Sequence, residues 1–116
     1  MREGADAMDL QVRSEVRGGW TVVAVTGELD ADTVPVLSDH LEETPGQRMV
    51  VDLSGVPFMD TTGLSLMLDW HRRLDTAGGQ FRMASLQPSV QKLFRLTELA
   101  EFMHIHDTVD EATTQA

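Results

Sequence analysis

The chain has 116 residues, with nine Lys and Arg against nineteen Asp and Glu, and it contains no cysteine. This length is typical of a single domain, and such a domain buries enough surface to fold without a metal or a disulfide. The absence of cysteine excludes disulfides, thiol chemistry and cysteine-ligated zinc, and the formal charge of −10 argues against a nucleic-acid partner or an anionic membrane surface.

The N-terminal part of the sequence predicts a β-hairpin. Apolar and polar residues alternate from Leu10, which places Leu10, Val12 and Val16 on the buried face of a half-exposed strand. Gly18-Gly19 is a turn signal, and residues 20–25 (WTVVAV) are rich in residues that favour strands. We therefore expect these two strands to pair antiparallel.

A helix and a buried strand are predicted next. The helix runs from about residue 33 to residue 43, and either Asp30 or Asp32 is placed to cap it. Residues 48–53 (RMVVDL) form a short, nearly continuous apolar run. Such a run is expected of a central strand that is covered on both faces.

Asp60-Thr61-Thr62-Gly63 is predicted to open a second helix. Leu66 and Trp70 lie to the flank of its main apolar stripe. This stripe is formed by Leu64, Met67, Leu68, His71 and Leu74.

The remaining sequence predicts two further strands and two further helices. Residues 80–86 (QFRMASL) are typical of a strand, and a helix follows from Pro88. Residues 102–106 (FMHIH) predict a weak last strand, after which Asp107 is placed to cap a short helix.

The order of these elements indicates an α/β fold. Strands that alternate with helices after a hairpin imply a mostly parallel, mixed sheet with an antiparallel N-terminal edge, covered by about four helices. We expect one domain over residues 8–112, with flexible tails at residues 1–7 and 113–116. No apolar run approaches the ~20 residues of a membrane span, so the expected location is the cytoplasm.

The start of the second helix is the first candidate site. A helix start presents unpaired N–H groups and stabilises negative charge, so Thr61 or Thr62 could accept a phosphoryl group there. The alternative is that Asp60 and a threonine only cap the helix, because such residues are routine caps. Local chemistry alone favours the capping reading, and it does not choose between Thr61 and Thr62 as an acceptor.

Acidic residues form the second candidate site. Glu28 and Asp30 follow one strand, and Asp60 follows the loop after the next, so these carboxylates are predicted to share a rim at the ends of the strands. They could hold magnesium or repel a new anion, or they could be ordinary solvated carboxylates. The four histidines predict no metal site, since none forms a helical ligand pair with another histidine.

Three motifs carry a resemblance to a known family. Residues 27–30 (GELD), 51–54 (VDLS) and 58–64 (FMDTTGL) occur in the order and spacing of the STAS domain. More narrowly, the chain resembles a stand-alone bacterial anti-sigma factor antagonist. The likeness extends from roughly Leu10 to Asp110, and the pair of GELD and FMDTTGL motifs is more specific than either motif alone.

The resemblance implies a phosphorylation switch rather than an enzyme. In that family, an ATP-dependent protein kinase that is also the anti-sigma factor binds the unphosphorylated antagonist, and a phosphatase reverses the modification. Carried over, the phosphoacceptor is Thr61, with Thr62 as the rival, although serine often stands at this position. Asp30 and Asp60 then belong to the partner-binding and phosphorylation region. No cofactor and no metal are implied.

Neighbouring residues complete the predicted partner-binding region. Leu66 and Trp70 are predicted to be apolar anchors for the partner, because they lie off the main buried stripe. The whole predicted region comprises Glu28, Asp30, Asp60, Thr62, Gly63, Leu66 and Trp70.

Two other functions remain open at this stage. The same fold could serve as a scaffold or accessory subunit of a stress-signalling or lipid-transport complex. A receiver domain phosphorylated on aspartate is a further alternative, but the chain begins with a hairpin and has no lysine in its predicted last strand. A phosphate ester that survives acid would separate Thr61 from an acyl phosphate.

Overall fold

A computed structural model describes residues 10–114 of the chain. In chain order these residues form β1 (Gln11–Arg17), β2 (Trp20–Thr26), α2 (Val34–Glu42), β3 (Arg48–Gly55), α3 (Thr61–Thr76), β4 (Gln80–Ala84), α4 (Pro88–Leu96), a 3₁₀ turn η1 (Leu99–Glu101), β5 (His104–His106) and α5 (Val109–Thr114). The predicted order of elements is confirmed, with the 3₁₀ turn added. Among these helices none is long and apolar enough to cross a membrane.

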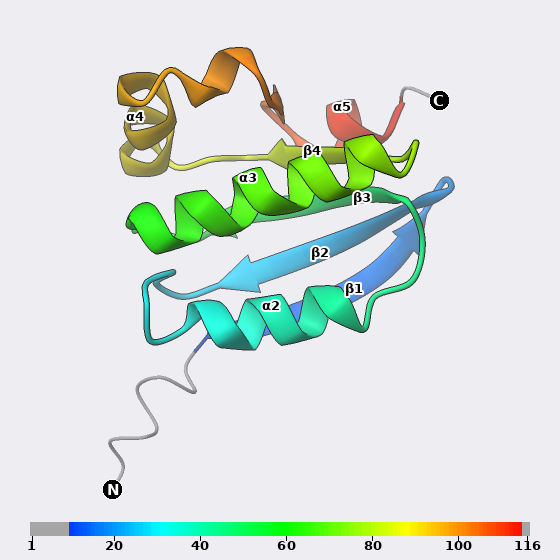
Figure 1. Cartoon of the computed structure of the whole chain (residues 1–116), viewed down its shortest axis with the longest axis horizontal. Helices are drawn as coiled ribbons and strands as arrows, with labels where there is room; N and C mark the ends of the chain where they lie inside the picture. The colour runs from blue at the N-terminus through cyan, green and yellow to red at the C-terminus, as the bar shows by residue number, and fades with distance from the viewer. Residues whose placement is uncertain (1–9, 115–116) are drawn as a thin grey trace, which may run out of the picture.

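The strands form a mixed sheet in the order β1-β2-β3-β4-β5, so that sequence order and spatial order coincide (Figure 1). β1 pairs antiparallel with β2, and the other neighbouring pairs are parallel. This arrangement confirms the predicted α/β class and its antiparallel N-terminal edge. β3 is the central strand, which explains its continuous apolar run.

The hairpin turn consists of two glycines. Arg17 lies opposite Trp20, and the turn residues Gly18 and Gly19 both have positive φ, at 59° and 87°. Two consecutive residues with positive φ make the turn whose twist matches that of the strands, and glycine adopts this conformation without a steric penalty. The predicted hairpin is therefore confirmed.

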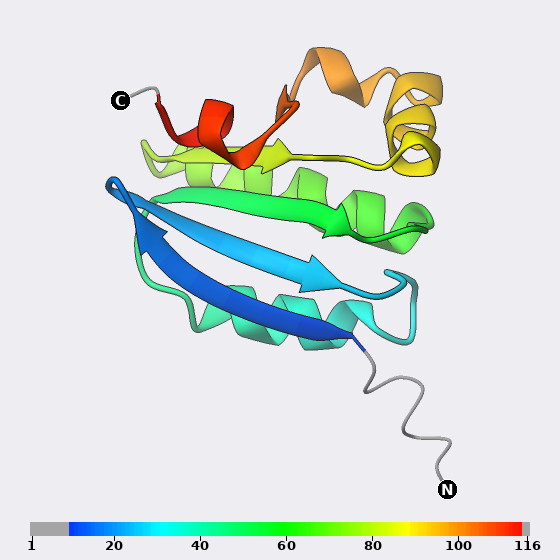
Figure 2. The ribbon, with the colours of Figure 1, turned by 180° about the vertical axis from the view of Figure 1, so that it is seen from behind.

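The two faces of the sheet are covered differently. α2 and α3 lie across one face (Figure 1), over the main core, which includes Val51 and Met67. On the opposite face α5 covers part of the sheet (Figure 2), over a smaller cluster that includes Trp20, Val50 and Ala112. The central strand is buried on both sides, as predicted, but the covering helices are distributed unequally.

β1 departs from the predicted alternation at its C-terminal end. Leu10 is buried and Val12 packs against the core, as predicted, but Val16 is 80% exposed. The residue opposite it on β2 is Thr21, and no described strand lies on its other side. Val16 therefore lacks the apolar neighbours that the alternation had implied.

The starts of α2 and α5 show which residues accept the main-chain hydrogen bonds there. Before α2, Oδ1 of Asp30 accepts hydrogen bonds from the amides of Asp32 (3.0 Å) and Thr33 (3.1 Å), so Asp30 closes the turn that leads into the helix, while the N-cap of α2 itself is Thr33, which makes no side-chain cap bond. At α5, the cap is the hydroxyl of Thr108, which accepts from the amide of Glu111 at 3.0 Å. The prediction of Asp107 as this cap was wrong by one residue.

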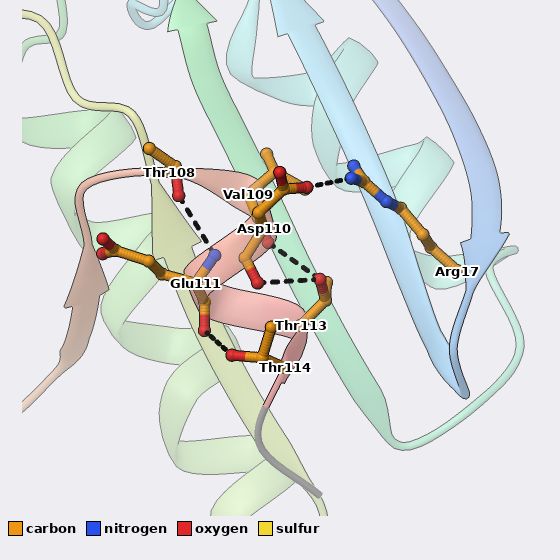
Figure 3. A network of polar contacts seen from close by, with 7 residues as sticks. All are labelled: Arg17, Thr108, Val109, Asp110, Glu111, Thr113 and Thr114. Atoms are coloured by element: carbon orange, nitrogen blue, oxygen red, sulfur yellow. Dashed lines mark hydrogen bonds and ion pairs between the residues drawn. The ribbon is translucent and has the colours of Figure 1, made fainter.

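One ion pair joins α5 to the sheet, and the other polar contacts drawn in Figure 3 lie within α5 and its cap. Arg17, at the end of β1, forms an ion pair with Asp110 of α5. Within the helix, the hydroxyl of Thr113 donates to the carbonyl of Val109 at 2.9 Å. Thr113 and Thr114, which we expected in the C-terminal tail, belong to α5, and the remaining tail residues lie outside the described part.

Candidate functional site

The two sequence motifs meet where β2 and β3 end. Leu29, in the GELD segment, forms a parallel bridge with Met59 of the FMDTTGL segment. The amide of Leu29 donates to the carbonyl of Phe58 at 2.9 Å, and the amide of Asp60 donates to the carbonyl of Leu29 at 3.1 Å. The expected common rim is confirmed, because these bonds continue the parallel pairing beyond the ends of the strands.

Asp60 caps α3. Its Oδ1 accepts from the amides of Thr62 (2.9 Å) and Gly63 (3.3 Å), which would otherwise be unpaired at the helix start. The hydrogen bond from the Thr62 hydroxyl lowers the pKa of Asp60 below its ordinary value, and the amides of Gly63, Thr62 and Ala31 lower it further. The charged Asp60 carboxylate therefore interacts both with the start of α3 and with Ala31, in the segment that follows β2.

The two neighbouring threonines have different surroundings. The hydroxyl of Thr62 donates to Oδ1 of Asp60 at 2.5 Å. Thr61 is exposed, and its hydroxyl makes no hydrogen bond within the described residues. Both threonines are exposed, and they differ in that the Thr62 hydroxyl is engaged with the Asp60 carboxylate.

Gly63 allows the helix start to pack closely against the GELD loop. A Cβ at this position would lie 2.6 Å from Cγ of Met59 and 3.1 Å from Cγ of Leu29. Real Cβ atoms are not found at the first of these distances, so a larger residue would push the loop and helix apart. Gly63 thus acts as a spacer, and its side of the helix is buried rather than available to a partner.

The carboxylates at the rim have two different roles. Asp60 caps α3 and Asp30 accepts from main-chain amides in the turn before α2, whereas the exposed Glu28 contributes its main-chain carbonyl, which accepts from the Thr33 hydroxyl at 2.8 Å. In residues 10–114 no group of three or more His, Asp or Glu side chains is arranged to hold a metal ion. The rim is therefore an acidic surface on which hydrogen bonds from main-chain amides hold the carboxylates of Asp30 and Asp60 in place.

The predicted apolar anchors differ in exposure. Leu66 is half-buried and packs against the main core, but Trp70 is only 6% exposed. The guanidinium of Arg73 lies 4.0 Å from the centre of the Trp70 ring and accounts for part of this cover. The expectation that Trp70 lies off the buried stripe was wrong, because the stripe is wide enough to include it.

Phe58 is an apolar residue of the rim that the sequence reasoning passed over as part of a connecting loop. Its side chain is 46% exposed, two residues before Asp60. The signal in the sequence was an apolar side chain within the FMDTTGL segment itself, next to the polar helix start. Phe58 therefore exposes an apolar side chain close in sequence to Thr61, whereas Trp70 is buried.

Comparison with known proteins places this geometry in a family. The model of the STAS domain matches residues 10–112. The chain belongs to the STAS domain family. The GELD and FMDTTGL motifs, on which the resemblance was based, are the segments that form the rim.

Within this family the chain is similar to anti-sigma factor antagonists. It is 29% identical over 112 residues to the anti-sigma F factor antagonist of Paenibacillus polymyxa, across 93% of this chain and 96% of that protein. The crystal structure of an anti-sigma factor antagonist from Mycobacterium paratuberculosis shares the fold, with a TM-score of 0.82 and 27% identity over 91% of this STAS protein and 92% of that chain.

A third comparison supports the fold alone. The structure of the Bacillus cell fate determinant SpoIIAA in its phosphorylated form has a TM-score of 0.66 and 23% identity, over 89% of this chain and 95% of that chain.

Proposed function

We propose that this STAS protein is an anti-sigma factor antagonist, which binds an anti-sigma factor in its unphosphorylated form and is switched off by phosphorylation of Thr61. The anti-sigma factor is the ATP-dependent kinase that modifies it, and a phosphatase restores the binding form. The antagonist is a substrate and a binding partner, and it catalyses no reaction.

The observation that carries this proposal is the difference between the two hydroxyls at the start of α3. Thr62 is engaged with Asp60, whereas Thr61 is exposed and makes no hydrogen bond within residues 10–114. In the transfer, the Thr61 oxygen forms a bond to the γ-phosphorus of ATP, the bond to the ADP oxygen breaks, and the hydroxyl proton leaves to a base of the kinase. An exposed hydroxyl that the helix cap does not hold is accessible to the kinase in the orientation that the transfer needs.

The physical effect of the modification is electrostatic. A phosphothreonine carries about −1.5 to −2 charges at neutral pH, and it would lie beside Asp60 and near the acidic GELD segment. The start of α3 offsets part of this charge within the domain, so the fold persists. Inside a docked interface the same charge is repelled and desolvated, which costs several kcal/mol, and about 1.4 kcal/mol already changes affinity tenfold.

The test begins with the partner. The unmodified chain, used as an affinity bait in the bacterium it comes from, should capture an anti-sigma factor kinase, which is identified by mass spectrometry. The captured kinase and ATP should then label the wild type and Thr62→Ala on residue 61, while Thr61→Ala stays unlabelled and is still bound. Equal labelling of Thr61→Ala and the wild type would refute the assignment.

The chemistry of the phosphate gives an independent check. A phosphothreonine ester survives acid, whereas an aspartyl phosphate is lost. Acid-labile phosphate on the labelled chain would favour the receiver-like alternative over the antagonist.

A further inference from the structure

The loop between β3 and α3 carries the exposed ring of Phe58 and leads to Thr61. Val56 and Met59 anchor this loop in the main core, where both are buried. Phe58 itself is 46% exposed, so packing alone does not fix its position. The hydrogen bonds of the loop's carbonyl groups therefore decide how Phe58 and the start of α3 are presented to a partner.

Two side chains at the start of α4 donate hydrogen bonds to this region. Oγ of Ser89 donates to the carbonyl of Pro57 at 2.6 Å, and Nε2 of Gln87 donates to the carbonyl of Ser54, near the end of β3, at 2.8 Å. Neither side chain makes another hydrogen bond within residues 10–114. Gln87 is the N-cap residue of α4, but its side chain makes no cap bond. Both donors therefore bind the neighbouring segment rather than their own helix.

The GELD segment and α4 hold the loop from opposite sides. The loop follows β3, which lies between β2 and β4 in the sheet. The GELD segment follows β2, and α4 follows β4 at the same end of the sheet (Figure 1). The carboxyl ends of neighbouring parallel strands thus bring three separate segments together around Phe58.

The two peptide groups that flank Phe58 are each held by one of these neighbours. The carbonyl of Pro57 accepts from Ser89, and the carbonyl of Phe58 accepts from the amide of Leu29 at 2.9 Å. Because peptide groups are planar and rigid, holding both of them restricts the two backbone dihedral angles of Phe58. The direction in which its side chain leaves the backbone therefore depends on both bonds.

We propose that Ser89 and Gln87 are positioning residues for the phosphorylation switch, which hold Phe58 and the start of α3 in the orientation that the anti-sigma factor kinase recognises. This role rests on the proposed function, in which Thr61 remains the phosphoacceptor, and the two residues act on it only through the loop. α4, which none of the sequence motifs includes, thus takes part in recognition of the partner.

The expected effect is on recognition rather than on the transfer itself. A loop that moves in the free chain must be ordered when the kinase docks, and this ordering weakens binding. The loss is the same in the ground state and in the transition state, so it raises KM and leaves kcat unchanged. The net contribution of one hydrogen bond corresponds to about threefold to tenfold in affinity.

The captured kinase and ATP test this with the chain as the varied substrate. Ser89→Ala should raise KM about threefold to tenfold, with kcat within about twofold of the wild type. Ser89→Thr keeps the hydroxyl and should restore the KM of the wild type. Ser85→Ala is the matched control, since its hydroxyl donates to the carbonyl of Asp107 at 3.3 Å, on the side of β4 away from the loop. A wild-type KM for Ser89→Ala would overturn the proposal.

A variant of Gln87 tests the second bond. Gln87→Met removes the donor and keeps an unbranched side chain of similar length, and it should also raise KM. The double variant S89A/Q87M should raise KM further than either single variant, because each bond holds a different carbonyl. Thermal unfolding establishes that every variant is folded at the assay temperature. A lower kcat with an unchanged KM would assign these residues to the transfer step and contradict the proposal.

Hydrogen exchange tests the same contacts without a partner. The amides of Leu29 and Asp60 donate to the carbonyls of Phe58 and Leu29, respectively, so they report on the loop. In Ser89→Ala, NMR should show both amides exchanging about threefold to tenfold faster, with amides at the centre of β3 unchanged. Unchanged exchange of both amides would overturn the proposal. A wild-type chain that no captured kinase phosphorylates would refute the proposed function instead, and the exchange rates would still decide whether Ser89 holds the loop.

Discussion

The hydroxyl of Thr62 donates a 2.5 Å hydrogen bond to Oδ1 of Asp60, and this bond is the largest cause of the lowered pKa of that carboxyl. Thr62→Val removes the donor and keeps the side-chain shape, so the pKa of Asp60 should rise toward its ordinary value of 3.8. An NMR titration of the side-chain carboxyl measures this. Thr61→Val should leave the pKa unchanged, because Thr61 makes no such bond within the described residues.

The same pKa shift has a consequence for stability. Because the pKa of Asp60 is lower in the folded chain, its contribution to stability is complete above pH 3.8 and is lost as the pH falls through the folded pKa. Asp60→Ala should lower the free energy of unfolding by about 1 kcal/mol at neutral pH, the usual cost of losing a helix cap. Urea unfolding should show this difference shrinking below pH 3.8, and an equal difference at all pH values would contradict the assignment.

A charged residue at position 61 should imitate the switched-off form. Thr61→Glu adds one charge beside Asp60, and we expect the affinity for the anti-sigma factor to fall at least about tenfold. Isothermal titration calorimetry with the captured partner measures the effect. Thr61→Ser is the matched control, since it keeps the hydroxyl and should bind and be phosphorylated. Undiminished binding by Thr61→Glu would remove the electrostatic explanation of release.

Gly63→Ala should destabilise the protein, although alanine normally favours a helix over glycine by about 1 kcal/mol. The added methyl would lie 2.6 Å from Cγ of Met59, and such overpacking typically costs about 1–3 kcal/mol. Chemical unfolding of the variant gives the sign directly. A more stable variant would mean that the GELD loop does not pack against the start of α3 in this way.

Trp70 and Phe58 should behave oppositely on truncation. Trp70→Ala removes a ring that is only 6% exposed, so it should lower the free energy of unfolding by about 3–5 kcal/mol. Phe58→Ala removes a half-exposed ring at the rim and should instead weaken partner binding, with a change in stability below about 1 kcal/mol. Comparing the melting temperature and the affinity of both variants separates the two roles.

Local patterns in the sequence were sufficient for most of the fold. The alternation in β1, the Gly18-Gly19 turn and the apolar run in β3 each predicted their element, because these signals depend on residues close together in the chain. The motifs also predicted a shared rim, since the carboxyl ends of parallel strands lie at one edge. Their pairing through Leu29 and Met59 followed from that order.

Only the tertiary structure decided which of these side chains are buried and which hydroxyls form hydrogen bonds. The burial of Trp70 depends on the width of the contact between α3 and the sheet, and the exposure of Val16 depends on its place at an open edge. Neither property is a function of spacing along the chain. Likewise, the sequence presented Thr61 and Thr62 as equal hydroxyls, and only the position of the Asp60 carboxylate, fixed by the helix cap, made one of them occupied and left the other free.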